Sequence, residues 1–209
     1  MGVVTVSRQY AAGGSAVAER IATGLEWTLI DNRCIDLVAA RLGVSPEEVA
    51  EHEERVEGLI DRLARTLAAA SPETYLTATP PDATTSPELE IHRVTQAVLD
   101  EVTREGNVVL VGRGAQAFLG SRPDAVHVYV VAPREVRVAS AAERLDLSPA
   151  DAARRVDEVD QRRRVYVRER YGRQWDDATN YHLVVNTGAL GEEGAAAVVI
   201  DAVRRLGMA

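Results

Sequence analysis

Five short runs of apolar, mostly β-branched residues recur along the chain, and they constrain its fold more than any other feature. Apolar residues fill most successive positions of each run, so both faces of the strand that it predicts are expected to be buried. Such strands are typical of parallel sheets covered by helices on either side. The sequence therefore predicts an α/β fold with a mainly parallel sheet. The predicted strands cover residues 3–6, 27–30, 107–111, 126–131 and 183–185.

Segments with apolar residues at helical spacing lie between the predicted strands. Ser45-Pro46-Glu47-Glu48 is a strong helix start, and this helix is expected to continue to about Ala70. Its apolar stripe could bind a partner or pack on its own domain. Residues 71–87 hold four of the eight prolines, which predicts a mobile loop. The other predicted helices cover residues 17–25, 35–42, 88–104, 134–144, 148–170 and 192–206.

The basic residues of the chain are all of one type. A length of 209 residues fits one domain, and a formal charge of −8 argues against a general nucleic-acid binder. All 24 lysine-plus-arginine positions are arginine. A GC-rich genome that favours arginine codons would explain this bias. Whatever its cause, it excludes lysine as a Schiff base, a general base or a phosphate ligand.

The sequence carries no signal for export or membrane insertion. Cys34 is the only cysteine, which excludes an intrachain disulfide and makes a cysteine zinc site implausible. The first residues have no basic stretch and only a short apolar run, unlike a signal peptide. No segment approaches the length of an uncharged membrane helix. We therefore expect a cytoplasmic protein. The four histidines form no metal-ligand spacing and are expected to be incidental.

The first predicted strand runs into a glycine-containing turn and then a helix, which is the arrangement that cradles phosphate groups. In the P-loop pattern G-x-x-x-x-G-K-[ST], Gly13 matches the second glycine, and Ser15 keeps the hydroxyl that normally binds Mg²⁺. Arg8 replaces the first glycine, and Gly14 stands where the lysine belongs. The turn is therefore either a phosphate loop without its usual cation or an ordinary tight turn.

The residues around this turn resemble those of a bacterial family. Residues 4–14 read Val-Thr-Val-Ser-Arg-Gln-Tyr-Ala-Ala-Gly-Gly and resemble the S-R-Q-Y-G-[SA]-G-G opening of the cytidylate kinase-like family. Glycine at the lysine position is a trait of that family, whereas Ala11 replaces a glycine that is usual in the loop. The resemblance continues through residues 27–31, 109–115, 148–170, Trp175 and 180–187, and so covers almost the whole chain.

The resemblance implies a P-loop NTPase-type fold with three α/β/α layers and a five-stranded parallel sheet. It implies a single nucleotide-kinase-like domain over residues 1–209, with a helical insertion at 32–106 that resembles a nucleoside monophosphate (NMP) binding region. Residues 148–180 resemble a lid. ATP with Mg²⁺ would supply the phosphoryl group, and a nucleotide or another small phosphate acceptor would receive it. Neither nucleic acid nor membrane is expected as a partner, and homo-oligomerisation is left open.

Three arginines are candidates for the missing positive charge and for catalysis. Arg8 lies at the mouth of the turn, although it could also be a surface arginine or part of a local salt bridge. The resemblance places Arg113 at the acceptor phosphate, where cytidylate kinases have a G-R-D segment. It places Arg163 at the donor phosphates, as the last residue of a D-x-x-D-x-x-R pattern that includes Asp157 and Asp160. A solvated helix with ion pairs would show the same spacing.

The remaining candidates follow the ends of predicted strands. The resemblance places Asp31 in the substrate region or near Mg²⁺, with a plain helix cap as the alternative. It places Asn186 and Thr187 near the adenine, in a role that positions the backbone. The predicted nucleotide-binding residues are Gly13, Gly14, Ser15, Asp31 and Asp160, and Ser15 is also the predicted metal ligand.

Two functions are compatible with these residues. The near full-length resemblance and the placement of the arginines favour an ATP-dependent phosphotransferase that resembles cytidylate and other NMP kinases. The alternative is a nucleotide-binding sensor or interaction protein with weak or no catalysis. It is motivated by the absence of the lysine and threonine that true cytidylate kinases carry in the loop.

Overall fold

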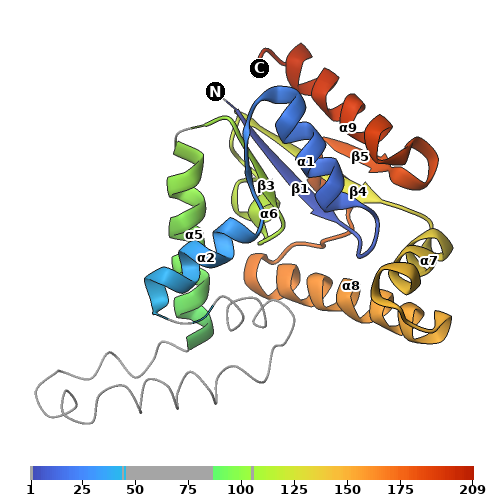
Figure 1. Ribbon diagram of the computed structural model, residues 1–209. Helices are drawn as coiled ribbons and strands as arrows, with labels where there is room; N and C mark the ends of the chain where they lie inside the picture. The colour runs from blue at the N-terminus through green and yellow to red at the C-terminus, as the bar shows by residue number, and fades with distance from the viewer. Residues whose placement is uncertain (1, 44, 46–86, 105) are drawn as a thin grey trace, which may run out of the picture. The chain divides into compact units, whose positions relative to one another are not determined.

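The computed structural model describes residues 2–43, 45, 87–104 and 106–209 (Figure 1). The helix predicted from residue 45 to about Ala70 and the loop predicted over 71–87 lie outside these residues, apart from their ends. The chain divides into two compact units. The larger unit combines Met1–Asp31 with Asp100–Ala209, and the smaller one is Asn32–Leu99.

A five-stranded parallel sheet forms the centre of the larger unit, as the apolar runs predict (Figure 1). Its order is β2-β3-β1-β4-β5, so β1 lies in the middle. Val6 of β1 aligns with Val111 of β3 on one side and with Val128 of β4 on the other. The strands are β1 (Val3–Arg8), β2 (Thr28–Ile30), β3 (Val108–Val111), β4 (Ala125–Val131) and β5 (Leu183–Asn186).

Helices follow the strands in the order that the sequence predicts, with three differences. The short helices α6 and η2 were not predicted, because a single turn leaves no periodic pattern to detect. The last helix, α9, also includes an unpredicted helical turn from Thr187, which joins the helix predicted from Glu192 at the non-helical residue Gly191, where φ is 66° and ψ is 173°. The helices of the larger unit are α1 (Gly14–Leu25), α6 (Ala115–Phe118), α7 (Arg134–Leu145), α8 (Pro149–Tyr171), η2 (Ala178–Asn180) and α9 (Thr187–Arg205).

The smaller unit contains α2 and most of α5, with buried apolar residues on both helices. In α2 (Asn32–Leu42) Val38 and Ala39 are buried, and in α5 (Pro87–Arg104) Val98 is buried. Within the described part of the chain, no helix combines the length and the apolar character that a bilayer span requires.

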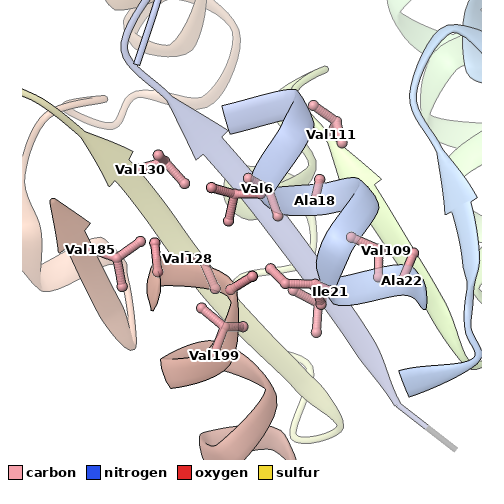
Figure 2. Packing of buried hydrophobic residues seen from close by; sticks show 14 of the residues in the cluster. Val6, Ala18, Ile21, Ala22, Val109, Val111, Val128, Val130, Val185 and Val199 are labelled. Carbon is pink, nitrogen blue, oxygen red and sulfur yellow. The ribbon is translucent and has the colours of Figure 1, made fainter. Parts of the chain in front are cut away.

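Successive side chains of β4 point to opposite faces of the sheet. Val128 packs with Ile21 of α1 and Val199 of α9 in the main apolar core (Figure 2). Tyr129 faces the opposite side and packs in a cluster with Val167 of α8. Helices therefore cover both faces of the sheet, which confirms the predicted three-layer α/β/α fold.

The carboxyl ends of all five strands meet at one edge, because the strands are parallel. In open α/β sheets, ligands bind outside this edge. Arg8 ends β1, Val111 ends β3, and Asp31 follows β2. The segments that hold the predicted nucleotide-binding and catalytic residues therefore meet at this edge.

Candidate functional site

The turn between β1 and α1 has the backbone geometry of an anion site. Ala11 and Gly13 adopt positive φ angles of 59° and 74°, and Gly13 is the N-cap of α1 without a capping side chain. The first helical bond runs from the Val17 N–H to the Gly13 carbonyl, at 3.0 Å. The N–H groups of Gly14 and the next two residues thus have no intrahelical acceptor. Such N–H groups and the helix dipole favour a negative charge at this end of α1.

The position where a P-loop carries its lysine is filled by the side chain of Arg8. A Cβ atom on Gly14 would lie 2.7 Å from the Cγ atom of Arg8, closer than real side chains approach. Gly14 is itself buried. Glycine at this position therefore allows the aliphatic part of Arg8 to cross the start of α1.

The guanidinium group of Arg8 reaches the segment that follows β3. Its Cζ atom lies 3.1 Å from the position that a Cβ atom on Gly112 would take. The Arg8 side chain thus extends from the first turn of α1 to the end of the neighbouring strand. The aliphatic part of Arg8 packs against Gly14, and the charged guanidinium lies between the loop and the turn after β3.

The turn after β3 is unusual in its backbone. Gly112, Arg113 and Gly114 all have positive φ angles, of 74°, 59° and 64°. For the arginine this left-handed conformation costs about 1 kcal/mol. The Gly112 N–H donates to the Val6 carbonyl oxygen at 3.1 Å, which ties the turn to β1. A Cβ atom on Gly114 would lie 2.9 Å from Cζ of Tyr171, so α8 packs directly on this turn.

Helices α7 and α8 hold the loop through the backbone of Tyr10. The Tyr10 N–H donates to Oδ1 of Asp160 at 2.8 Å, and Nη1 of Arg137 donates to the Tyr10 carbonyl oxygen at 3.3 Å. Asp160 and Arg137 pair at 2.7 Å, with side chains only 4% and 8% exposed. Asp160 thus contacts the backbone of the loop from within the protein interior. Arg137 was not predicted, because nothing in the sequence distinguishes it from the exposed arginines of α7.

Further arginines of α8 surround the same loop residue. Nη1 of Arg163 donates to the Arg8 carbonyl oxygen at 2.7 Å, and its guanidinium lies 5.9 Å from the centre of the Tyr10 ring. The guanidinium of Arg155 lies 6.0 Å from the same ring. Asp157 pairs instead with Arg134 at the exposed junction of α7 and α8. Asp160 and Arg163 of the D-x-x-D-x-x-R pattern therefore contact the loop segment.

The segment after β5 also contacts the loop. Thr187 Oγ1 donates to the Ala12 carbonyl oxygen at 2.8 Å, which fixes the loop backbone. The carboxylate of Glu192 packs on Gly13, with Oε1 2.6 Å from the position of a Cβ atom there. Glu192 was not predicted, because the kink at Gly191 that directs it toward the loop leaves no pattern in the sequence.

The two remaining predicted residues lie at the same edge of the sheet. Ser15 is exposed in the first turn of α1, and Asp31 is half-buried directly after β2. Among the described residues, no three histidine, cysteine or carboxylate side chains are grouped as a ready-made metal site. One hydroxyl at a phosphate loop still fits Mg²⁺, because this ion commonly binds few protein groups and takes its other ligands from phosphates and water.

An aromatic cluster packs on the face of the sheet that α8 covers. Tyr129 stacks on Tyr181 at 4.8 Å and meets Trp175 edge to face at 5.3 Å. The Tyr181 hydroxyl donates to the Trp175 carbonyl oxygen at 2.6 Å. Burial is the main cause that raises the pKa of Tyr181 to about 12 and that of Tyr129 further still. Both hydroxyls therefore stay protonated at neutral pH.

Two histidines form a second polar cluster within the sheet. His127 is buried, and its Nδ1 lies 2.8 Å from the Thr5 hydroxyl. Its ring stacks on that of His182 at 4.9 Å, although the sequence separates them by 55 residues. Burial, followed by the charge of His182, lowers the pKa of His127 to about 4. Linear spacing alone could not predict this pair.

Comparison with known proteins gives one family and several more distant relatives. The model of the cytidylate kinase-like family matches residues 3–189. A cytidylate kinase of Halobacterium salinarum is 33% identical over 97 residues, which are 46% of this chain and 50% of that protein. A cytidylate kinase of Methanocaldococcus jannaschii is 31% identical over 109 residues, or 51% of this chain and 61% of that protein. The chain thus matches about half to three fifths of these relatives.

Solved structures share the fold at much lower identity. An uncharacterized protein from Eubacterium ventriosum superposes with a TM-score of 0.66 at 16% identity, over 98% of this chain and 99% of that one. A shikimate kinase from Bacteroides thetaiotaomicron superposes with a TM-score of 0.56 at 12% identity, over 97% and 98% of the two chains. These structures support the P-loop type of α/β fold.

Proposed function

The chain belongs to the cytidylate kinase-like family, and we propose that it transfers a phosphoryl group from ATP to a nucleotide or another small phosphate acceptor. The observation that carries this proposal is the course of Arg8. Its side chain crosses Gly14 at the start of α1 and places an arginine beside the turn where a phosphate loop needs a cation. An arginine can supply that charge because its guanidinium binds phosphate oxygens through two parallel hydrogen bonds.

The donor phosphates would bind at the first turn of α1. Backbone N–H groups of Gly13, Gly14 and Ser15 would face the phosphate oxygens, and Arg8 and Arg163 would balance their charge. Ser15 would supply one oxygen ligand to Mg²⁺. That ion, when bound with ATP, neutralises charge on the transferred phosphoryl group.

The acceptor would bind beside the turn after β3. The three left-handed residues at 112–114 present Arg113 at the end of the strand next to β1. Arg113 would hold the acceptor phosphate, and Asp31, after the next strand, would contact the acceptor. Phosphoryl transfer requires mainly that donor and acceptor lie in line and that their charges are compensated. These residues are suited to both tasks without a lysine.

Two segments of the chain have separate roles in this proposal. We propose residues 32–106 as the acceptor-binding insertion and 148–180 as the lid-like segment of one kinase domain. Asp160 lies in that segment, but it is buried and bonded to the Tyr10 backbone. Its proposed role in nucleotide binding is therefore to position the loop, while Arg163 makes the direct contact.

A nucleotide-binding protein without turnover is the alternative function. It is favoured by Ala16, which stands where true cytidylate kinases have the threonine of the loop. It is also favoured by the turn after β3, which carries Gly114 where those kinases have an aspartate. Both changes remove polar groups next to the proposed phosphates.

The experiment that separates the two functions is an acceptor panel. ADP formation from ATP and Mg²⁺ is measured with each common NMP and with other small phosphorylated acceptors. We expect turnover with at least one acceptor, and its loss in Arg8→Ala and Arg113→Ala. Arg205→Ala is the matched control, because Arg205 pairs with Asp201 near the far end of α9. ATP binding without turnover would support the alternative, and the absence of ATP binding would refute both.

A further inference from the structure

A carboxylate lies directly against the proposed phosphate loop. Gly191 kinks α9 just before Glu192, and Thr187 anchors the preceding turn to the loop carbonyl of Ala12. Oε1 and Cδ of Glu192 lie 2.6 and 3.2 Å from the position that a Cβ atom on Gly13 would take. Since a Cα–Cβ bond spans about 1.5 Å, the carboxylate is within about 4 Å of the Gly13 Cα atom.

The ion pair that Glu192 forms with Arg20 does not account for the position of its carboxylate beside the loop. Arg20 Nη1 lies 3.5 Å from Oε2 of Glu192, and the two side chains are 47% and 43% exposed. An ion pair this long and this exposed contributes little to stability. Meanwhile a negative charge beside N–H groups that favour anions opposes the binding of phosphate there.

We infer that Glu192 is a specificity residue of the proposed phosphate site, which selects ATP complexed with a divalent cation over metal-free ATP. This inference rests on the proposed function. Coulomb repulsion scales with the charge of the ligand, and Mg²⁺ cancels part of the negative charge of the triphosphate. Glu192 therefore weakens the binding of metal-free ATP more than that of MgATP, without contacting the reacting atoms.

The test compares two dissociation constants for each variant, measured by isothermal titration calorimetry with ATP in EDTA and with ATP in excess Mg²⁺. Glu192→Gln is expected to tighten metal-free ATP binding by about threefold to tenfold, as for a half-exposed charge near the ligand. MgATP binding is expected to tighten by only the square root of that factor, about twofold to threefold, because Mg²⁺ halves the charge of ATP. Glu192→Asp keeps the charge and is expected to retain most of the discrimination.

Asp201→Asn is the matched control, because it removes the same charge from the same helix. Asp201 lies nine residues further along α9, or about 13 Å by helical rise, and pairs with Arg205. That distance exceeds the Debye length of about 8 Å at physiological salt, so neither constant should change. Melting temperatures of all variants show whether each one is folded.

Three results would overturn the inference. In the first, Glu192→Gln changes both constants by the same factor, as expected of a purely structural role. In the second, Glu192→Asp behaves like Glu192→Gln, which would make side-chain length and not charge decisive. In the third, the two constants of Glu192→Gln equal those of the wild type. If the wild-type protein binds neither form of ATP, the proposed function itself fails, and this outcome is distinct from the other three.

Discussion

Replacing Asp160 by alanine is expected to destabilise the protein far more than the same change at Asp157. Both aspartates join α8 to α7 through an arginine 23 residues earlier in the chain. The pair of Asp160 with Arg137 is buried, with side chains 4% and 8% exposed, whereas the pair of Asp157 with Arg134 is more than half exposed. The two substitutions therefore change the same chemical group at the same kind of junction, and only the burial differs.

The magnitude follows from what each substitution leaves behind. Asp160→Ala leaves a buried guanidinium without its counterion and deprives the Tyr10 N–H of its acceptor. Breaking a buried ion pair in this way costs about 3–5 kcal/mol of the free energy of unfolding. Asp157→Ala removes a pair that water already screens, and little loss is expected.

Urea unfolding followed by circular dichroism gives the free energy of unfolding of both variants. ATP binding of Asp160→Ala, measured below its unfolding transition, is expected to weaken, because the loop has lost its anchor at Tyr10. A free energy for Asp160→Ala within 1 kcal/mol of that for Asp157→Ala would contradict the reasoning, since about 3 kcal/mol separates the two expectations. It would mean that the buried pair does not hold the loop.

Two further predictions concern Gly14 and His127. Gly14→Ala is expected to weaken ATP binding at least tenfold, because its Cβ atom would displace the Arg8 side chain 2.7 Å away. Gly194→Ala, where the nearest atom is 3.4 Å away, is the control and should bind as the wild type; equal affinities for all three proteins would exclude this role of Gly14. The pKa of His127 is about 4 in the folded protein against 6.5 as the reference, so the unfolded chain binds more protons between these values. The contribution of His127 to the free energy of unfolding is fully present above pH 6.5, and it is thus expected to fall by about 3 kcal/mol as the pH drops to 4. The free energy of unfolding of His127→Gln, measured in urea at pH 6.5 and pH 4, should fall by less than that of the wild type. An equal fall in both proteins would refute the assignment.

The sheet could be predicted because its strands are buried on both faces. A continuous apolar run such as Val3–Val6 has few alternatives when turn residues bound it, and the strands agree with the predicted ranges within two residues. Elements that depend on tertiary contacts could not be predicted in this way. The turn at Thr187 lacks helical periodicity, and it forms because its hydroxyl bonds the loop carbonyl of Ala12.

The candidate site could be predicted only as a set of residues. The P-loop pattern showed that Gly14 stands at the position of the usual lysine. It could not show that the Arg8 side chain occupies the space where a side chain of residue 14 would lie. The contacts of Arg137 and Glu192 with the loop join residues more than 120 positions apart in the sequence. Such contacts arise from packing of distant elements, and no local pattern records them.

Arg8 is proposed to take the place of the phosphate-loop lysine, and moving the cation from residue 8 to residue 14 tests this substitution. The dissociation constant of MgATP is measured for the wild type, Arg8→Ala and the double variant Arg8→Ala with Gly14→Lys. Arg8→Ala should bind at least tenfold more weakly, as for the loss of a charge-assisted hydrogen bond. The double variant should regain much of the affinity, because removing the Arg8 side chain frees the space beside residue 14 for a lysine. Wild-type affinity in Arg8→Ala would contradict the claim.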